Sequence, residues 1–126
     1  MATVTIYVDY NSSGQGNHKL SLSDSEGHVG SGTNKDDITT DVSSGDIIKW
    51  QIASGSTVSD IVTVSHKTGY VEFLENITHN ADGSVSATVK SGFAGGTMEA
   101  YNISYKVTGD STVHTDDPKL SMNPTT

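Results

Sequence analysis

The sequence of 126 residues has no cysteine and no arginine. Without cysteine, the chain cannot form disulfides, thiolate metal sites or iron–sulfur clusters, and it has no cysteine nucleophile. Seven lysines against fifteen aspartates and glutamates give a formal net charge of −8. Binding to nucleic acid and to anionic membranes both depend on an excess of basic side chains, so we expect neither.

Long hydrophobic runs are also absent. No stretch of the chain reaches the length that a membrane-spanning helix needs. The first lysine is Lys19, and threonine interrupts the apolar residues of the N-terminal segment, so the basic and apolar regions of a secretory signal are not visible. We therefore expect a cytoplasmic protein.

Strong helix formers are scarce, with four leucines, six alanines and four glutamates against twenty valines and isoleucines. Side chains that branch at Cβ suit a pleated strand better than a helix. Eighteen serines, sixteen threonines and thirteen glycines add residues that are typical of turns and of exposed strand faces. The composition predicts an all-β protein.

The order of the apolar residues supports the same prediction. Apolar and polar residues alternate in several short segments, which is the pattern of a strand with one buried face. Trp50, the only tryptophan, lies in one of these segments and is expected in the core. Strands are predicted at residues 3–9, 18–23, 47–53, 70–76, 85–89, 98–107, 111–114 and 119–122.

Two segments lack a clear period. Residues 58–64 are expected to form an irregular crossover that ends in a strand, and residues 25–41 a loop with at most one short strand. Asp82-Gly83 is a strong hairpin signal. Short strands with a turn about every ten residues predict a single domain over residues 1–126, an antiparallel Greek-key β-sandwich with a loose tail from about residue 123.

No catalytic motif stands out. There is no Gly-x-Ser-x-Gly motif, and serine is too frequent for one to be singled out as a nucleophile. A Ser–His–Asp triad is defined by its geometry in space, so the sequence leaves it open. We expect a protein without enzymatic activity. Metal-ligand spacings such as His-x-His and His-x-x-x-His are absent among His18, His28, His66, His79 and His114.

Two groups of oxygen-bearing side chains resemble parts of a calcium site. The segment from Asp9 to Gly14 matches the first half of a calcium-binding loop, but its twelfth position is Leu20 instead of a glutamate. An acidic group lies further along the chain, where a solvated loop is the simpler explanation. The candidate calcium ligands are Asp9, Asn11 and Ser13 in the first group and Asp36, Asp37 and Asp41 in the second.

One stretch resembles the cupredoxin-like proteins. The segment from Gly45 to Trp50, which reads Gly-Asp-Ile-Ile-Lys-Trp, is similar to the strand that opens with Gly-Asp in cupredoxin-like sandwiches. The resemblance implies a sandwich of cupredoxin-like or immunoglobulin-like type. It does not imply copper, because a blue-copper site requires a cysteine thiolate.

The C-terminal third resembles a second group. Residues 101–107, followed by Asp117-Pro118 and Asn123-Pro124, are similar to small uncharacterised bacterial proteins of the DP-EP type, with Asn-Pro here in place of Glu-Pro. They are also similar, more distantly, to bacterial inclusion-body proteins. Pro118 is expected to start the last strand and to keep its edge from pairing with other chains.

These features together predict a non-catalytic bacterial β-sandwich protein that acts by binding or assembly, without a cofactor. The alternative is a calcium- or carbohydrate-binding module that uses the loops at one end. Because an open sandwich has sheet edges, association of copies through edge strands is a further expectation.

Overall fold

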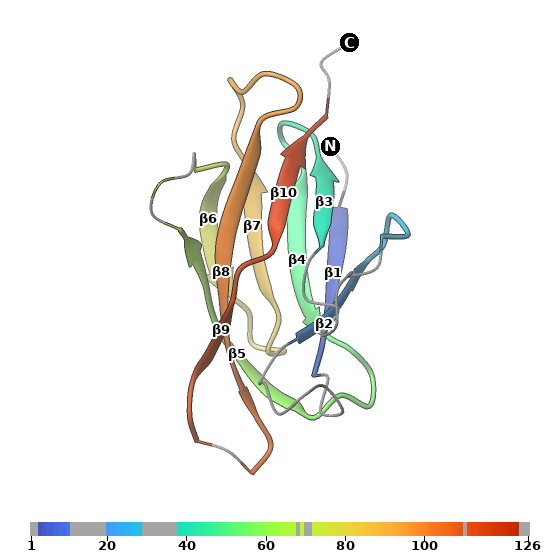
Figure 1. The fold of residues 1–126 in the computed structure, drawn as a ribbon, viewed down its shortest axis with the longest axis vertical. Coiled ribbons are helices and arrows are strands. Elements are labelled where there is room, and N and C mark those ends of the chain that lie inside the picture. The colour runs from blue at the N-terminus through green and yellow to red at the C-terminus, as the bar shows by residue number, and fades with distance from the viewer. Residues whose placement is uncertain are drawn as a thin grey trace.

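Figure 1 shows the chain in a computed structural model, which describes residues 3–10, 20–28, 38–67, 69, 72–109 and 111–123. None of the described residues is helical, so none belongs to a helix that could cross a membrane. The strands are β1 (Thr3–Tyr10), β2 (Leu20–Asp24), β3 (Thr39–Val42), β4 (Ile47–Ile52), β5 (Val58–His66), β6 (Leu74–His79), β7 (Val85–Val89), β8 (Met98–Val107), β9 (His114–Asp116) and β10 (Lys119–Met122).

The strands form two sheets, and the prediction of an all-β sandwich is confirmed. The first sheet has the order β2-β1-β4-β7-β6, and the second has the order β3-β10-β8-β5 with β9 also paired to β8. The expectation that every pairing is antiparallel is wrong for β1 with β4 and for β10 with β3, which are parallel. Parallel neighbours need a long crossover, and here the chain visits other strands before it returns.

Both sheets contribute to one hydrophobic core, as the alternating pattern predicted. Trp50 and Tyr101 face each other across it with ring centroids 5.6 Å apart, and the Trp50 indole N–H donates to the Tyr101 hydroxyl at 3.0 Å. Burial raises the pKa of Tyr101 above its ordinary value, so this hydroxyl stays neutral. The bond satisfies two polar groups that would otherwise be costly to bury.

Three segments differ from their predicted form. Residues 58–66 form a full strand, β5, whose irregularity is limited to two register shifts against β8. The strand predicted at 70–76 begins later, at Leu74, and the Phe73 N–H before it donates to the Glu99 side chain. The strand predicted at 111–114 is β9, at His114–Asp116. The hairpin at Asp82-Gly83 is confirmed, with φ of +89° at Gly83.

Pro118 directly precedes β10, as predicted, but its predicted protection of a sheet edge is wrong. β10 lies between β3 and β8, so Pro118 does not protect a sheet edge. Pro118 is buried between β9 and β10, and its carbonyl accepts the Tyr101 N–H at 3.0 Å. The tail predicted from residue 123 starts no earlier than 124, because the Asn123 N–H donates to the Val42 carbonyl at 2.7 Å. Residues 124–126 lie outside the described part.

Candidate functional site

The polar side chains that could carry chemistry gather along the two open sides of the sandwich. β2 and β6 end the first sheet, and β3 and β5 end the second. Figure 1 shows β2 and β3 on one side of the molecule and β5 and β6 on the other. We call these the β2/β3 side and the β5/β6 side.

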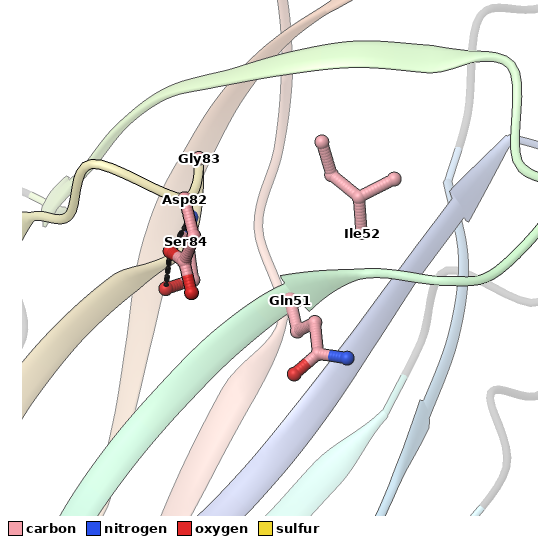
Figure 2. Close-up of a pocket in the computed structure, with 5 residues that line it drawn as sticks. All are labelled: Gln51, Ile52, Asp82, Gly83 and Ser84. Carbon is pink, nitrogen blue, oxygen red and sulfur yellow. Dashed lines mark hydrogen bonds between the residues drawn. The ribbon is translucent and has the colours of Figure 1, made fainter.

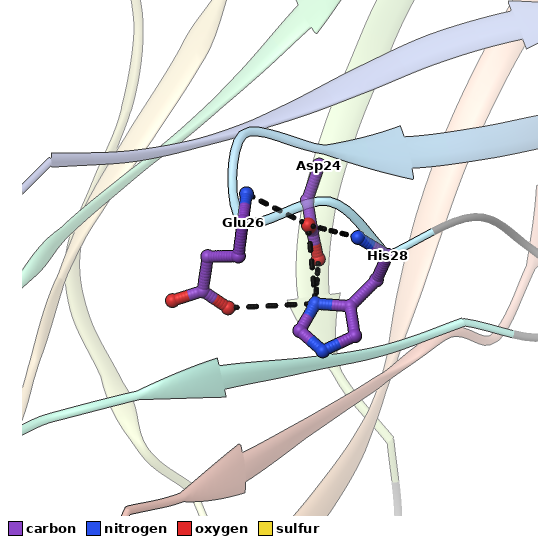
Figure 3. A group of neighbouring side chains, drawn as sticks. All are labelled: Asp24, Glu26 and His28. Carbon is purple, nitrogen blue, oxygen red and sulfur yellow. Dashed lines mark hydrogen bonds and ion pairs between the residues drawn. The ribbon is translucent and has the colours of Figure 1, made fainter.

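On the β2/β3 side, Asp24 organises the turn that follows β2. Its side chain is fully buried, and Oδ1 accepts the backbone N–H groups of Glu26 and His28, each at 3.0 Å. Oδ2 accepts the Thr40 hydroxyl of β3 at 2.7 Å. One carboxylate therefore fixes the turn, as Figure 3 shows, and through Thr40 it also ties the turn to the edge of the other sheet.

His28 stands between three carboxylates in this turn. Its Nδ1 lies 3.0 Å from Asp24 Oδ2 and 3.6 Å from Glu26 Oε1, and its Nε2 lies 3.4 Å from Asp41 Oδ2 on β3. Glu26 Oε1 also accepts the Asp41 N–H at 3.1 Å. Partial burial first, and then the charge of Asp24, raise the pKa of the Glu26 carboxyl. We call Asp24, Glu26, His28 and Asp41 the β2/β3 cluster.

The β2/β3 cluster has a donor set that could bind a metal ion. One ligand atom each from Asp24, Glu26 and His28 lie within 4.8 Å of one another. A mixed nitrogen and oxygen set suits zinc or another transition ion better than calcium, which takes oxygen ligands. Both Asp24 oxygens already accept hydrogen bonds, so an ion would have to compete with the contacts that hold the turn.

The β5/β6 side holds a second cluster, made of His66, Glu72 and Glu99. The Glu99 side chain, on β8, is fully buried, and its Oε2 lies 2.8 Å from His66 Nδ1 on β5. Its Oε1 accepts the Phe73 N–H at 2.9 Å. His66 Nε2 lies 3.6 Å from Glu72 Oε1. The buried carboxylate therefore joins β5 and the start of β6 to a strand inside the sheet.

A third histidine bridges β6 and β5. The His79 ring nitrogen Nε2 lies 2.7 Å from the Ile61 carbonyl, and because a carbonyl only accepts, this nitrogen carries the proton. The same nitrogen lies 3.5 Å from Asp60 Oδ1. His79 thus places a donor on a backbone group of β5, the strand that ends the second sheet.

A shallow hollow of about 280 Å³ lies where the β6–β7 hairpin separates from the end of β4. Figure 2 shows its lining residues, Gln51, Ile52, Asp82, Gly83 and Ser84. Hydrogen bonds from the Ser84 hydroxyl and N–H lower the pKa of Asp82. These bonds belong to the hairpin turn, and no aromatic ring on which a sugar could stack is among the lining residues.

The predicted calcium ligands are placed only in part. Asp9 lies near the end of β1, where its carboxylate accepts the Tyr10 N–H at 2.8 Å. Asp41 lies on β3 beside His28. Asn11, Ser13, Asp36 and Asp37 lie outside the described residues, so calcium binding there stays a prediction.

Sequence reasoning named one member of the first cluster, Asp41, as a candidate ligand, and it missed the other members and the whole second cluster. The alternating Asp24-x-Glu26-x-His28 pattern, just after a predicted strand, is a signal that could have revealed the first one. No local signal exists for the second, because Glu99 and His66 are 33 residues apart.

Comparison with known proteins shows a similar fold for this chain and no matching family. The two sheets define a small all-β sandwich of mixed strand direction. No protein-family model and no curated protein matches the sequence. The fold is similar to the crystal structure of the inclusion body protein PixA from Burkholderia cenocepacia, with a TM-score of 0.53 and 12% identity over 98% of this chain and 95% of that one. The expected distant likeness to inclusion-body proteins is thus confirmed for the fold.

Proposed function

We propose that this protein is not an enzyme and that it works by assembling with copies of itself. The observation that carries the first half of the proposal is how the described histidines are used. His28 and His66 contact carboxylates, and His79 contacts a backbone carbonyl and a carboxylate. These three histidines each fix a turn or join strands, and the fourth described histidine, His114, lies beside the Tyr105 ring with centroids 5.6 Å apart. These contacts favour a structural role over the activation of a nucleophile.

Two observations support the second half. The protein with a similar fold is named an inclusion body protein, and that name favours assembly as the use of this sandwich. The two sheets also end in the edge strands β2, β6, β3 and β5, and β9 pairs with β8 alone, and a strand at an edge presents backbone donors and acceptors on which another chain can pair.

Sedimentation velocity of the purified protein, from micromolar to millimolar concentrations, tests this proposal. We expect the mean sedimentation coefficient to rise with concentration. Each copy carries a formal charge of −8, so added salt should screen the repulsion and strengthen association through backbone pairing. A monomer at every concentration and salt level would overturn the proposal.

A second candidate function is the binding of a divalent transition ion by the β2/β3 cluster. The proximity of three ligand atoms within 4.8 Å favours it. Calorimetric titration with zinc and, separately, with calcium tests it. Heat with zinc that is lost in His28→Gln and kept in His79→Gln would support this candidate, and no heat with either ion would exclude it.

We also infer that the chain belongs with the copper-free, cupredoxin-like bacterial proteins of the DP-EP type. The segment that carries the first resemblance forms the start of β4, with Trp50 fully buried. The Asp117-Pro118 pair that carries the second joins β9 to β10. Sequences of relatives that keep both features would support this inference, and relatives that lose either one would weaken it.

A further inference from the structure

Among the described residues, five strands have a side without a strand partner: β2, β3, β5, β6 and β9. All but β2 are protected against pairing with another chain, and β9 is so because it has only three residues. β5 has two register shifts, and its Ile61 carbonyl accepts the His79 side chain. β6 has one register shift, next to Asn76, whose φ of +55° breaks the extended backbone. Bulges, side-chain caps and charges are the usual means of protecting sheet edges.

β3 is protected in another way. It is four residues long, and β10 pairs with it on one side. The Lys119 N–H donates to the Ile38 carbonyl, and the Asn123 N–H donates to the Val42 carbonyl. Successive residues of a parallel strand point their backbone groups to opposite sides, so the Asp41 N–H points away from β10. The Glu26 side chain accepts the Asp41 N–H on that outer side.

In the part of the chain that the structure describes, none of these protections is found along residues 20–23 of β2. Its pairing with β1 runs without a shift from Tyr10 opposite Leu20 to Ile6 opposite Asp24. The residues 20–23 read Leu-Ser-Leu-Ser and carry no charge, whereas Asp41, Asp60 and Glu75 lie on the other edge strands. Of the edges formed by described residues, β2 is therefore the one on which a regular strand can add.

The hydrogen-bond pattern identifies the backbone groups that face outward from β2. The Ser25 N–H donates to the Thr5 carbonyl. Backbone groups alternate in direction along an antiparallel pair, so those of Ser23 and Ser21 point toward β1, and those of Leu22 and Leu20 point away from it. The Asp24 N–H and carbonyl are engaged in the following turn, by His28 and Gly27. The backbone groups on which another strand could pair are thus confined to residues 20–22.

We propose that a second copy of this chain adds its own β2 antiparallel to β2, about a two-fold axis at Ser21. This inference rests on the proposed assembly function and names the surface that carries it. Leu20 of each copy exchanges hydrogen bonds with Leu22 of the other, which joins the two first sheets into one. In a chain of charge −8, this edge contact places no like charges directly opposite each other. Because a two-fold axis uses the β2 edge of both copies, the pairing ends at a dimer.

A single cysteine tests the register. The natural chain has no cysteine, so Ser21→Cys introduces the only thiol. Across the axis the two residues 21 form a non-hydrogen-bonded pair with Cα atoms about 4.5 Å apart, a distance that a disulfide accepts. We expect mild oxidation to give a covalent dimer. The matched control is Ser59→Cys, an exposed residue on β5, which should stay monomeric under the same conditions.

A proline tests the edge independently. Leu20→Pro removes an outward N–H at the first residue of an edge strand, a position where proline is tolerated, and Leu20→Ala controls for the lost side chain. In sedimentation, Leu20→Pro should associate at least tenfold more weakly than Leu20→Ala.

The outcomes separate the two proposals. If the natural chain stays monomeric, self-assembly itself is wrong, and this inference falls with it. If the natural chain assembles but Ser21→Cys cross-links no more than Ser59→Cys, then assembly stands and β2 is not its surface. Equal association of Leu20→Pro and Leu20→Ala would likewise exclude β2 as the surface, and if Leu20→Pro does not fold, the cysteine pair alone decides.

Discussion

The β2/β3 side and the β5/β6 side have the same arrangement of acidic and histidine side chains. On each side a fully buried carboxylate, Asp24 or Glu99, faces the Nδ1 atom of a partly exposed histidine, at 3.0 Å or 2.8 Å. The Nε2 atom of that histidine then faces an exposed carboxylate, Asp41 or Glu72. Asp24 also accepts two backbone N–H groups, and Glu99 accepts one.

The two sides differ in what the buried carboxylate holds. Asp24 fixes a turn within four residues of itself and reaches the second sheet through Thr40. Glu99 ties an inner strand to His66, 33 residues away, and to the segment before β6. As far as the described residues show, the contacts that hold the β2/β3 side lie at the end of β2, and residues 20–23 keep an open edge.

The largest effect is expected from Glu99→Ala on the β5/β6 side. The substitution removes the acceptor of the Phe73 N–H and the partner of His66 in a fully buried place. We expect the free energy of unfolding to fall by about 2 to 4 kcal/mol. Urea unfolding followed by Trp50 fluorescence measures it. Glu99→Gln, which keeps an acceptor for Phe73, should lose less, and a loss near zero for Glu99→Ala would contradict the account.

On the β2/β3 side, Asp24→Ala should cost less than Glu99→Ala. It leaves two turn N–H groups and the Thr40 hydroxyl without their acceptor, but the turn lies at the edge, where water can reach part of it. We expect a loss of about 2 kcal/mol. Asp24→Asn keeps one oxygen that can accept the two turn N–H groups and replaces the other oxygen with an amide nitrogen, so it is the matched control. Equal losses for the alanine and asparagine variants would show that charge, and not hydrogen bonding, holds this side.

His79→Ala tests the single-histidine bridge between β6 and β5. The ring is partly exposed and its main bond is to the Ile61 carbonyl, so we expect a loss of about 1 kcal/mol or less. Glu75→Ala, on an exposed position of the same strand, should change stability within about 0.5 kcal/mol. Thermal unfolding of the two variants compares them directly. A larger loss in Glu75→Ala than in His79→Ala would be evidence against the bridge.

The smallest effect is expected from Glu26→Gln, and it depends on pH. Because the pKa of Glu26 is raised in the folded protein, ionisation of this carboxyl costs stability once the pH rises through that value. Glu26→Gln should therefore be more stable than the natural chain at neutral pH, by less than about 0.5 kcal/mol because solvent screens the charge. The difference should vanish below the ordinary pKa of glutamate.

Asp82→Asn is the control with the opposite sign. The pKa of Asp82 is lowered by its bonds to Ser84, so its ionised form stabilises the hairpin above the ordinary aspartate value, and this contribution is lost in acid. Denaturation from acid to neutral pH should show Glu26→Gln gaining and Asp82→Asn losing stability relative to the natural chain. The same sign for both variants would contradict the assigned causes.

The features that depend on neighbouring residues could be predicted from the sequence. The alternation of apolar and polar residues placed Trp50 in the core, and Trp50 is buried. The Asp82-Gly83 hairpin followed from turn chemistry alone. Strand direction could not be predicted, because the parallel pairing of β1 with β4 depends on where the chain runs between them. The Glu99 site was equally hidden, since its partners come from β5 and from the segment before β6.

Amide hydrogen exchange at Leu22 tests most directly whether β2 is the surface on which copies assemble. The Leu22 N–H faces outward, and the Ser23 N–H faces β1, so neighbouring residues report on the open and the paired side of one strand. The account predicts that exchange at Leu22 slows as the protein concentration rises, while exchange at Ser23 does not change. A Leu22 exchange rate that is the same in dilute and concentrated protein, under conditions where the protein assembles, would contradict it.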